Sequence, residues 1–158
     1  MKESFTSEID QIDVKILRLL QQDGRLSNAE LAERVNVSAA TCHRRVRRLV
    51  KEGYIRGFRA VIDPDRVELG TIALVGVVLD RSTPESFAEF ETVVKLMVEV
   101  LDCHLVTGDF DYLLKIRVHD MADFNRFHAE SLIALPGVRQ ARTFFAIKEV
   151  KDGSPLVF

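Results

Sequence analysis

The chain has 158 residues and a net charge of −2, and apolar residues make up 47% of it. This length fits one ordinary domain or two small ones, and this apolar content excludes wholesale disorder. The longest nearly unbroken apolar run, residues 72–79, is too short to span a bilayer, and residues 1–10 lack the apolar core of a secretory signal. The two cysteines show neither a zinc-site nor a disulfide pattern, so we expect a cytoplasmic protein without a metal or other cofactor.

The charge is divided unevenly along the chain. Residues 1–59 contain 12 Lys and Arg against 8 Asp and Glu, whereas residues 60–158 contain 10 against 16. The first part is therefore basic and the second acidic, which indicates two modules with different partners.

Helical spacing of apolar residues predicts a first helix over residues 9–22, ended by Gly24 in the left-handed conformation. Ser27 and Glu30 form a capping-box pattern that opens a short second helix. Asn36 tolerates a positive φ and marks a tight turn, after which Ser38 caps a third helix that runs to about residue 52. Two short helices joined by such a turn predict a helix-turn-helix in residues 1–53.

The third helix has one apolar and one basic side. Small polar residues lie at the N-terminal end of its outward side, and cations follow, as in a helix that reads the major groove of DNA. Arg44 is the best candidate for a guanine contact because its planar fork matches O6 and N7, whereas Arg48 is expected on a phosphate. A merely solvated basic face is the alternative. The candidate DNA-binding residues are Asn28, Ser38, Ala40, Thr41, His43, Arg44, Arg45, Arg47, Arg48 and Lys51.

Residues 54–70 are predicted to form a wing and a linker strand. Phe58, Ala60 and Ile62 alternate in the period of a strand, and Asp63-Pro64 ends the segment. A small strand pair is expected here.

Residues 71–158 are predicted to form a second domain with the order strand, helix, strand, strand, helix, strand. Thr83 and Pro84 open its first helix, and Asp120 caps its second, with Met121, Phe124 and Phe127 inward. Residues 138–150 read as a long last strand. The fold class is therefore α+β, with a ferredoxin-like βαββαβ sheet whose uncovered face favours a dimer.

Two carboxylates, Asp109 and Asp111, flank the predicted hairpin turn of this domain beside Gly108. Such a pair could bind a metal, transfer protons, hold a cationic ligand or shape a turn. The hairpin offers too few further oxygen ligands for a metal, and none of the four histidines has a visible nucleophile partner, which disfavours an enzyme.

The motif S-x-x-T-C-x-x-R-V-x-R-L at residues 38–49, with Gly-Tyr-Ile at 53–55, resembles the Lrp/AsnC family of bacterial regulators. DCHLVTGDFDYLLK at 102–115 and LPGVRQARTF at 135–144 resemble the effector domain of that family, closest to its leucine-responsive branch. The resemblance implies a winged helix-turn-helix regulator associated with the nucleoid, dimers that assemble to octamers, and an amino-acid effector, with leucine or methionine favoured. A DNA-architectural protein without an effector is the alternative.

The resemblance also places the effector between dimers, near the hairpin turn. Asp111 can pair with the effector ammonium or with the N–H groups of the turn itself, and turn formation is the better interpretation of Asp109. Leu105, Met121 and Phe145 are expected to form an apolar wall. The candidate effector-binding residues are Leu105, Thr107, Gly108, Asp109, Phe110, Asp111, Met121 and Phe145.

Overall fold

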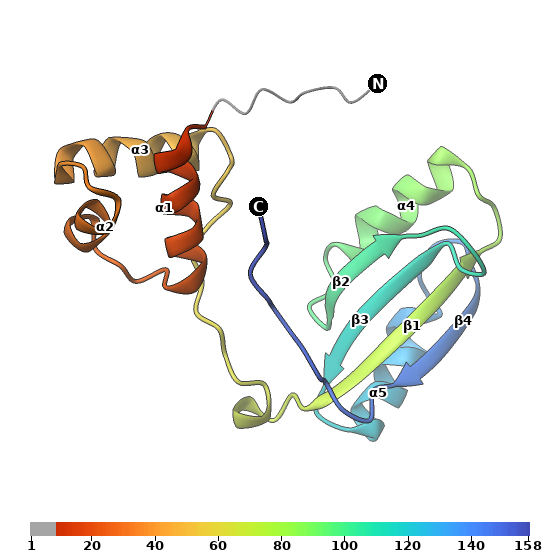
Figure 1. The fold of residues 1–158 in the computed structure, drawn as a ribbon. Helices are drawn as coiled ribbons and strands as arrows, with labels where there is room; N and C mark the ends of the chain where they lie inside the picture. Colours follow the sequence, from red (N-terminus) through yellow and green to blue (C-terminus); the bar gives the residue numbers. More distant parts are fainter. Residues whose placement is uncertain (1–8) are drawn as a thin grey trace. The chain divides into compact units, whose positions relative to one another are not determined.

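The structure is a computed structural model that describes residues 9–158, and these residues divide into two compact units (Figure 1). Residues 9–61 and 151–158 make up the helical unit, and residues 62–150 make up the sheet unit. The tail 151–158, expected in the second domain, groups with the helical unit because Leu156 exchanges two hydrogen bonds with Gln21. No helix in residues 9–158 is long and apolar enough to cross a bilayer.

Three helices form the helical unit: α1 (Gln11–Gln22), α2 (Asn28–Val35) and α3 (Ala39–Lys51). Each begins at a side chain that accepts hydrogen bonds from the first turn, namely Asp10, Ser27 and Ser38. Ile16, Leu31, Val35, Cys42 and Leu49 form its core.

The start and the end of α1 both differ from prediction. The cap at Asp10 starts α1 at Gln11 instead of Ile9. The helix ends through an extended Asp23, so Gly24 is not left-handed as predicted. By contrast, Asn36 has a φ of 56°, which confirms the predicted left-handed turn between α2 and α3.

The predicted strand pair is absent from residues 54–70, where the structure has only a 3-10 turn at Asp65–Val67. The alternating side chains Phe58 and Ile62 are exposed instead of packed. An isolated two-stranded hairpin is marginal without a hydrophobic face to cover, and this segment packs too few side chains to supply one.

The sheet unit contains β1 (Thr71–Leu79), α4 (Pro84–Val94), β2 (Val100–Leu105), β3 (Tyr112–Val118), α5 (Met121–Phe127) and β4 (Val138–Phe145), with a π-helical turn at His128–Leu132. The strand order is β2-β3-β1-β4, and all neighbours are antiparallel. This arrangement confirms the predicted βαββαβ sheet.

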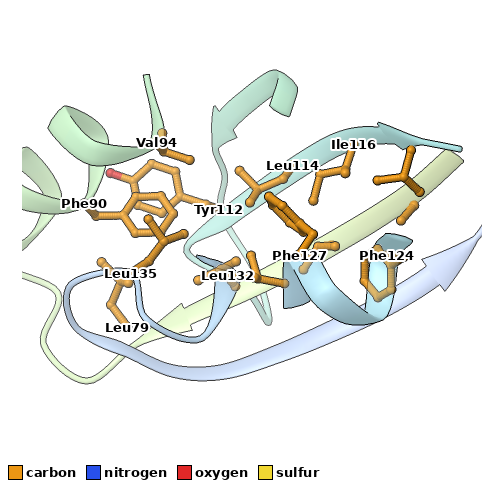
Figure 2. Packing of buried hydrophobic residues seen from close by; sticks show 14 residues of the cluster. Leu79, Phe90, Val94, Tyr112, Leu114, Ile116, Phe124, Phe127, Leu132 and Leu135 are labelled. Carbon is orange, nitrogen blue, oxygen red and sulfur yellow. The ribbon is translucent and has the colours of Figure 1, made fainter. Parts of the chain in front are cut away.

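Both helices of the sheet unit cover the same face of the sheet. Figure 2 shows Phe90 of α4 stacked beside Tyr112 of β3, and Phe127 of α5 packed beneath Leu114. Phe124 is also buried, but Met121 is half exposed and does not point inward as predicted. Because Asp120 is the N-cap of α5, Met121 is the first residue of the helix and lies at the rim of the core.

The last strand is shorter than predicted. β4 ends at Phe145, and one further bond joins Ala146 to Ile72 at the start of β1. After Ala146 no further backbone hydrogen bond joins the described chain to β1, and the chain leaves the sheet. Glu149 then forms ion pairs with Lys115 and Arg117 on the face without helices.

Candidate DNA-binding helix and effector-binding turn

The outward side of α3 carries Arg44, Arg47 and Lys51, and all three side chains are exposed. They follow one another at intervals of three and four residues, so they lie on one face of the helix. Within the described chain none of them forms an ion pair. Their charges are therefore available to an external anion.

Arg45 and Arg48 point the other way, onto α1. The Arg45 guanidinium lies 2.8 Å from Asp10 and 2.9 Å from Asp13, and Arg48 donates to the second oxygen of Asp13. Asp13 is fully buried. Hydrogen bonds from its guanidinium, first to Asp13 and then to Asp10, raise the pKa of Arg45. The DNA contacts expected of Arg45 and Arg48 remain untested, but both guanidinium groups are already engaged within the protein.

The remaining candidates surround the N-terminus of α3. Ser38 Oγ accepts from the Thr41 amide at 3.2 Å and donates to the Thr41 hydroxyl at 2.9 Å. The Asn28 amide lies 3.2 Å from His43 Nδ1 and links α2 to α3. Ala40 is exposed on the same turn as Thr41. Small and polar groups thus occupy the end of the helix at which base edges are read in helix-turn-helix proteins.

The hairpin turn between β2 and β3 spans residues 106–111. The Val106 amide donates to the Asp111 carbonyl, and the Asp111 amide donates to the Val77 carbonyl, both at 2.9 Å. Within the described residues the four amides between them, at 107–110, have no hydrogen-bond partner. Gly108, at a φ of 118°, allows the chain to turn here. The turn thus presents free N–H donors of the kind that bind a carboxylate.

The two carboxylates of the turn have different surroundings. Asp111 Oδ2 accepts from the Leu79 amide at 2.8 Å, and Oδ1 accepts from the Ser82 hydroxyl at 3.3 Å. Asp109 is exposed and makes no recorded hydrogen bond or ion pair within the described chain. Asp111 therefore holds the end of β1 through its hydrogen bonds. The Asp109 carboxylate is exposed and is not bonded to any described residue.

Phe110 closes the turn over the face of the sheet that lacks helices. Its ring lies so close to Gly76 that a Cβ on this residue would stand 2.6 Å from three ring carbons. Arg142 of β4 extends over the same ring, 6.0 Å from its centroid. Leu74 and Phe144 remain exposed on this face, 44% and 55%, so an apolar surface persists beside Phe110.

The three apolar residues expected to wall one pocket are not together. Leu105 pairs with Tyr112 and lies beside the turn, 55% exposed. Phe145 pairs with Ala73, and Met121 follows the last residue of β3, so both lie at the other end of the sheet. The length of β3 separates the two ends by about 20 Å. Within one chain, Leu105 on one side and Met121 and Phe145 on the other therefore do not line a common pocket, and the expected effector site between dimers stays a prediction.

Residues 9–158 contain no group of three or more His, Cys, Asp or Glu side chains placed to hold a metal ion. Burial raises the pKa of both the Cys42 and Cys103 thiols, which disfavours their reactive thiolate forms.

Asp13 is a residue whose importance the sequence analysis missed. It shares a capping box with Asp10, in which each side chain accepts from the backbone of the other residue. The D-x-x-D spacing was visible in the sequence and resembles a capping box. The pairing of Asp13 with α3 depends on tertiary packing and had no sequence signal.

Comparison with known proteins gives matches along nearly the whole chain. Residues 9–56 match a family model described as winged helix-turn-helix DNA-binding, and residues 72–156 match the Lrp/AsnC ligand binding domain. The leucine-responsive regulatory protein of Escherichia coli strain K12 is 44% identical over 150 residues, covering 95% of this chain and 92% of that protein. The protein of the same name from Salmonella typhimurium strain LT2 is 43% identical over the same shares.

Solved structures agree with these matches. A Neisseria meningitidis transcriptional regulator in complex with L-Met is 38% identical, with a TM-score of 0.84 over 93% of this chain and 96% of that one. An AsnC family transcriptional regulator from Agrobacterium tumefaciens is 33% identical, with a TM-score of 0.87 over 94% and 97% of the two chains.

Proposed function

Because the chain belongs to the Lrp/AsnC family of DNA-binding transcriptional regulators, which are not enzymes, we propose that it couples DNA binding to an amino-acid effector, with leucine or methionine favoured. Two similar proteins support this choice of effector. The relative from Escherichia coli is named for its response to leucine, and the Neisseria meningitidis neighbour was solved with L-Met.

The observation that carries the DNA-binding half of the proposal is the unpaired cationic side of α3. Arg44 is nearest the N-terminal end and is the proposed guanine contact, while Arg47 and Lys51 neutralise phosphates. Ser38, Ala40 and Thr41 line the end that approaches the bases. Asn28 and His43, which contact each other, are proposed to meet the backbone together.

The effector half rests on the open turn. Free N–H groups at residues 107–110 suit the carboxylate of an amino acid, and the free carboxylate of Asp109 suits its ammonium. Leu105 is the exposed apolar residue beside the turn. Asp111 acts behind the turn, where it fixes the chain direction through Leu79.

Met121 and Phe145 lie at the far end of the sheet, so we propose that they complete the effector site from another copy of the chain. The exposed Leu74 and Phe144 on the uncovered sheet face supply an apolar surface for a dimer, and dimers are proposed to assemble further to octamers. An effector bound between copies would then alter assembly and the spacing of the DNA-binding units. Light scattering with and without amino acid measures this directly.

Calorimetry tests the effector proposal. Leucine or methionine titrated into the full chain should release or absorb heat, and Asp109→Asn should weaken that binding at least tenfold because a charged contact to the ammonium is lost. Glu89→Gln, on the exposed side of α4, is the matched control and should leave binding unchanged. The absence of heat with both amino acids, together with normal DNA binding, would favour an effector-independent DNA-architectural protein.

A further inference from the structure

Asp13 is the acidic residue that joins α1 to the DNA-binding helix. Its side chain is 1% exposed, and its two oxygens are divided between Arg45 at 2.9 Å and Arg48. Asp10 adds a second contact to Arg45 at 2.8 Å. Among the described residues the Nε atoms of both arginines have no hydrogen-bond partner and are buried, so the inner part of each guanidinium is shielded from solvent.

The five cations of the central and last turns of α3 are thereby divided into two sets. Arg45 and Arg48 are one turn apart and face α1, whereas Arg44, Arg47 and Lys51 face outward. A helix held at two successive turns by one buried carboxylate has little freedom to rotate about its axis. Rotation of α3 about its axis would move Arg44, Arg47 and Lys51 relative to the DNA bases.

The partly exposed arginines could otherwise reach phosphates. Their side chains are 23% and 39% exposed, and both have the length to swing into solvent if their acid were removed. Each additional phosphate contact strengthens binding to any DNA sequence and adds about 0.9 to the slope of log K against log salt. Cations released in this way would add affinity without adding sequence information.

We propose that Asp13 is a specificity-determining positioning residue: it fixes the orientation of α3 and withholds Arg45 and Arg48 from DNA phosphates. This inference rests on the DNA-binding function. It predicts that the sequence preference of the protein depends on a buried acid that does not contact DNA.

The surroundings of Asp10 and Arg45 favour the charged form of both groups. Hydrogen bonding from the Asp13 amide, with smaller effects from Arg45, lowers the pKa of Asp10, and the acceptors Asp13 and Asp10 raise the pKa of Arg45. Arg45 is thus held to α1 by charge-assisted hydrogen bonds, and an amide in place of a carboxylate weakens such bonds.

The test compares Asp13→Asn with Asp23→Asn in the full chain. Both variants replace one acid of the helical unit by an amide, but Asp23 only accepts from the Arg25 amide at 2.9 Å, which an amide oxygen also does. Two DNA duplexes of the same length are used. One is selected from a random library by the wild-type protein, and the other has a random sequence. Fluorescence anisotropy gives both affinities over a series of salt concentrations.

Asp13→Asn should bind random DNA more tightly, by about fivefold at about 0.15 M salt for each of Arg45 and Arg48 that reaches a phosphate. Its slope of log K against log salt should be steeper by about one to two. The ratio of its affinity for the selected duplex to its affinity for the random-sequence duplex should fall at least tenfold. Asp23→Asn should keep the wild-type ratio within about twofold. If Asp13→Asn matches Asp23→Asn while the wild type still prefers the selected duplex, the inference is wrong; if the wild type binds neither duplex, the DNA-binding function itself fails.

A second pair of variants does not require a stable Asp13→Asn protein. Arg47→Gln and Arg48→Gln remove neighbouring cations of α3, one outward and one paired with Asp13. Arg47→Gln should lower the salt slope by about one, and Arg48→Gln should leave the slope on random DNA unchanged. Equal losses of slope would show that Arg48 contacts phosphate and would overturn the inference.

Discussion

Replacing Asp111 by alanine removes the acceptor of a backbone hydrogen bond at the end of β1. The Leu79 amide donates to Asp111 at 2.8 Å, and Leu79 itself is 3% exposed, so water reaches this amide poorly once the carboxylate is gone. Leaving a buried donor without its acceptor costs about 1–3 kcal/mol. We therefore expect Asp111→Ala to destabilise the sheet unit by about 2 kcal/mol.

For a domain the size of the sheet unit, 1 kcal/mol corresponds to about 4–8 °C in Tm, so the expected shift is about 8–16 °C. Scanning calorimetry of the full chain measures this shift in the transition of the sheet unit. Hydrogen exchange followed by mass spectrometry should also show faster exchange in the peptide that contains Leu79. Asp109→Ala is the control and should shift Tm by less than about 4 °C, because the Asp109 side chain forms no hydrogen bond or ion pair with residues 9–158.

Equal shifts for the two variants would refute this assignment of roles. A large shift for Asp109→Ala alone would show that the exposed carboxylate is the one that stabilises the turn. In either case the proposed division between a structural Asp111 and a ligand-binding Asp109 would have to be abandoned.

Three further variants and conditions test the packing and charge of the two units. Gly76→Ala should displace the Phe110 ring, which stands 2.6 Å from the new Cβ, and cost about 1–3 kcal/mol, whereas Ala88→Gly on α4 should cost only about 1 kcal/mol. Phe90→Ala should cost about 3–5 kcal/mol because the ring is fully buried against Tyr112; a cost below 1 kcal/mol in urea unfolding would contradict this packing. Hydrogen bonds from the backbone and from Ser27 lower the pKa of Asp10 and Glu30 respectively, so their contribution to stability is complete above about pH 5 and is lost as the pH falls through the folded values. The Tm of the helical unit should accordingly drop between about pH 5 and pH 3, and a Tm independent of pH in this range would exclude a stabilising role for these caps.

Local signals in the sequence were sufficient for most of the fold. The cap residues Ser27, Ser38, Thr83 and Asp120 set four helix starts correctly, because a side-chain acceptor next to an apolar period acts within a few residues. Asn36 likewise marked the turn between α2 and α3. The order of strands and helices in the sheet unit followed from periodicity together with these caps.

The errors occurred where tertiary contacts decide. The alternation at Phe58 and Ile62 has the period of a strand, but a strand also needs a partner and a surface to cover. Met121 has the spacing of a core residue yet lies at the rim, and its distance from the turn at residues 106–111 depends on the direction of β3. Periodicity contains no such information.

The roles of single charged residues were the least predictable. Arg45 and Arg48 look like their neighbours Arg44 and Arg47 in the sequence, and only the position of Asp13 on α1 separates the two pairs. The expected contact of Asp111 with the effector stays a prediction, and its hydrogen bond from the Leu79 amide, which is distant in the sequence, had no sequence signal. Both cases depend on pairs more than 30 residues apart.

The central claim is that an amino acid bound by the sheet unit changes DNA binding by the helical unit. The most direct measurement is the Kd for the selected duplex with and without saturating leucine or methionine, together with the Kd for the same amino acid with and without saturating duplex. Linkage requires that both ratios are equal, and the account predicts a common ratio of at least about fivefold in either direction. An amino acid that binds with measurable heat and leaves both ratios at one would contradict it.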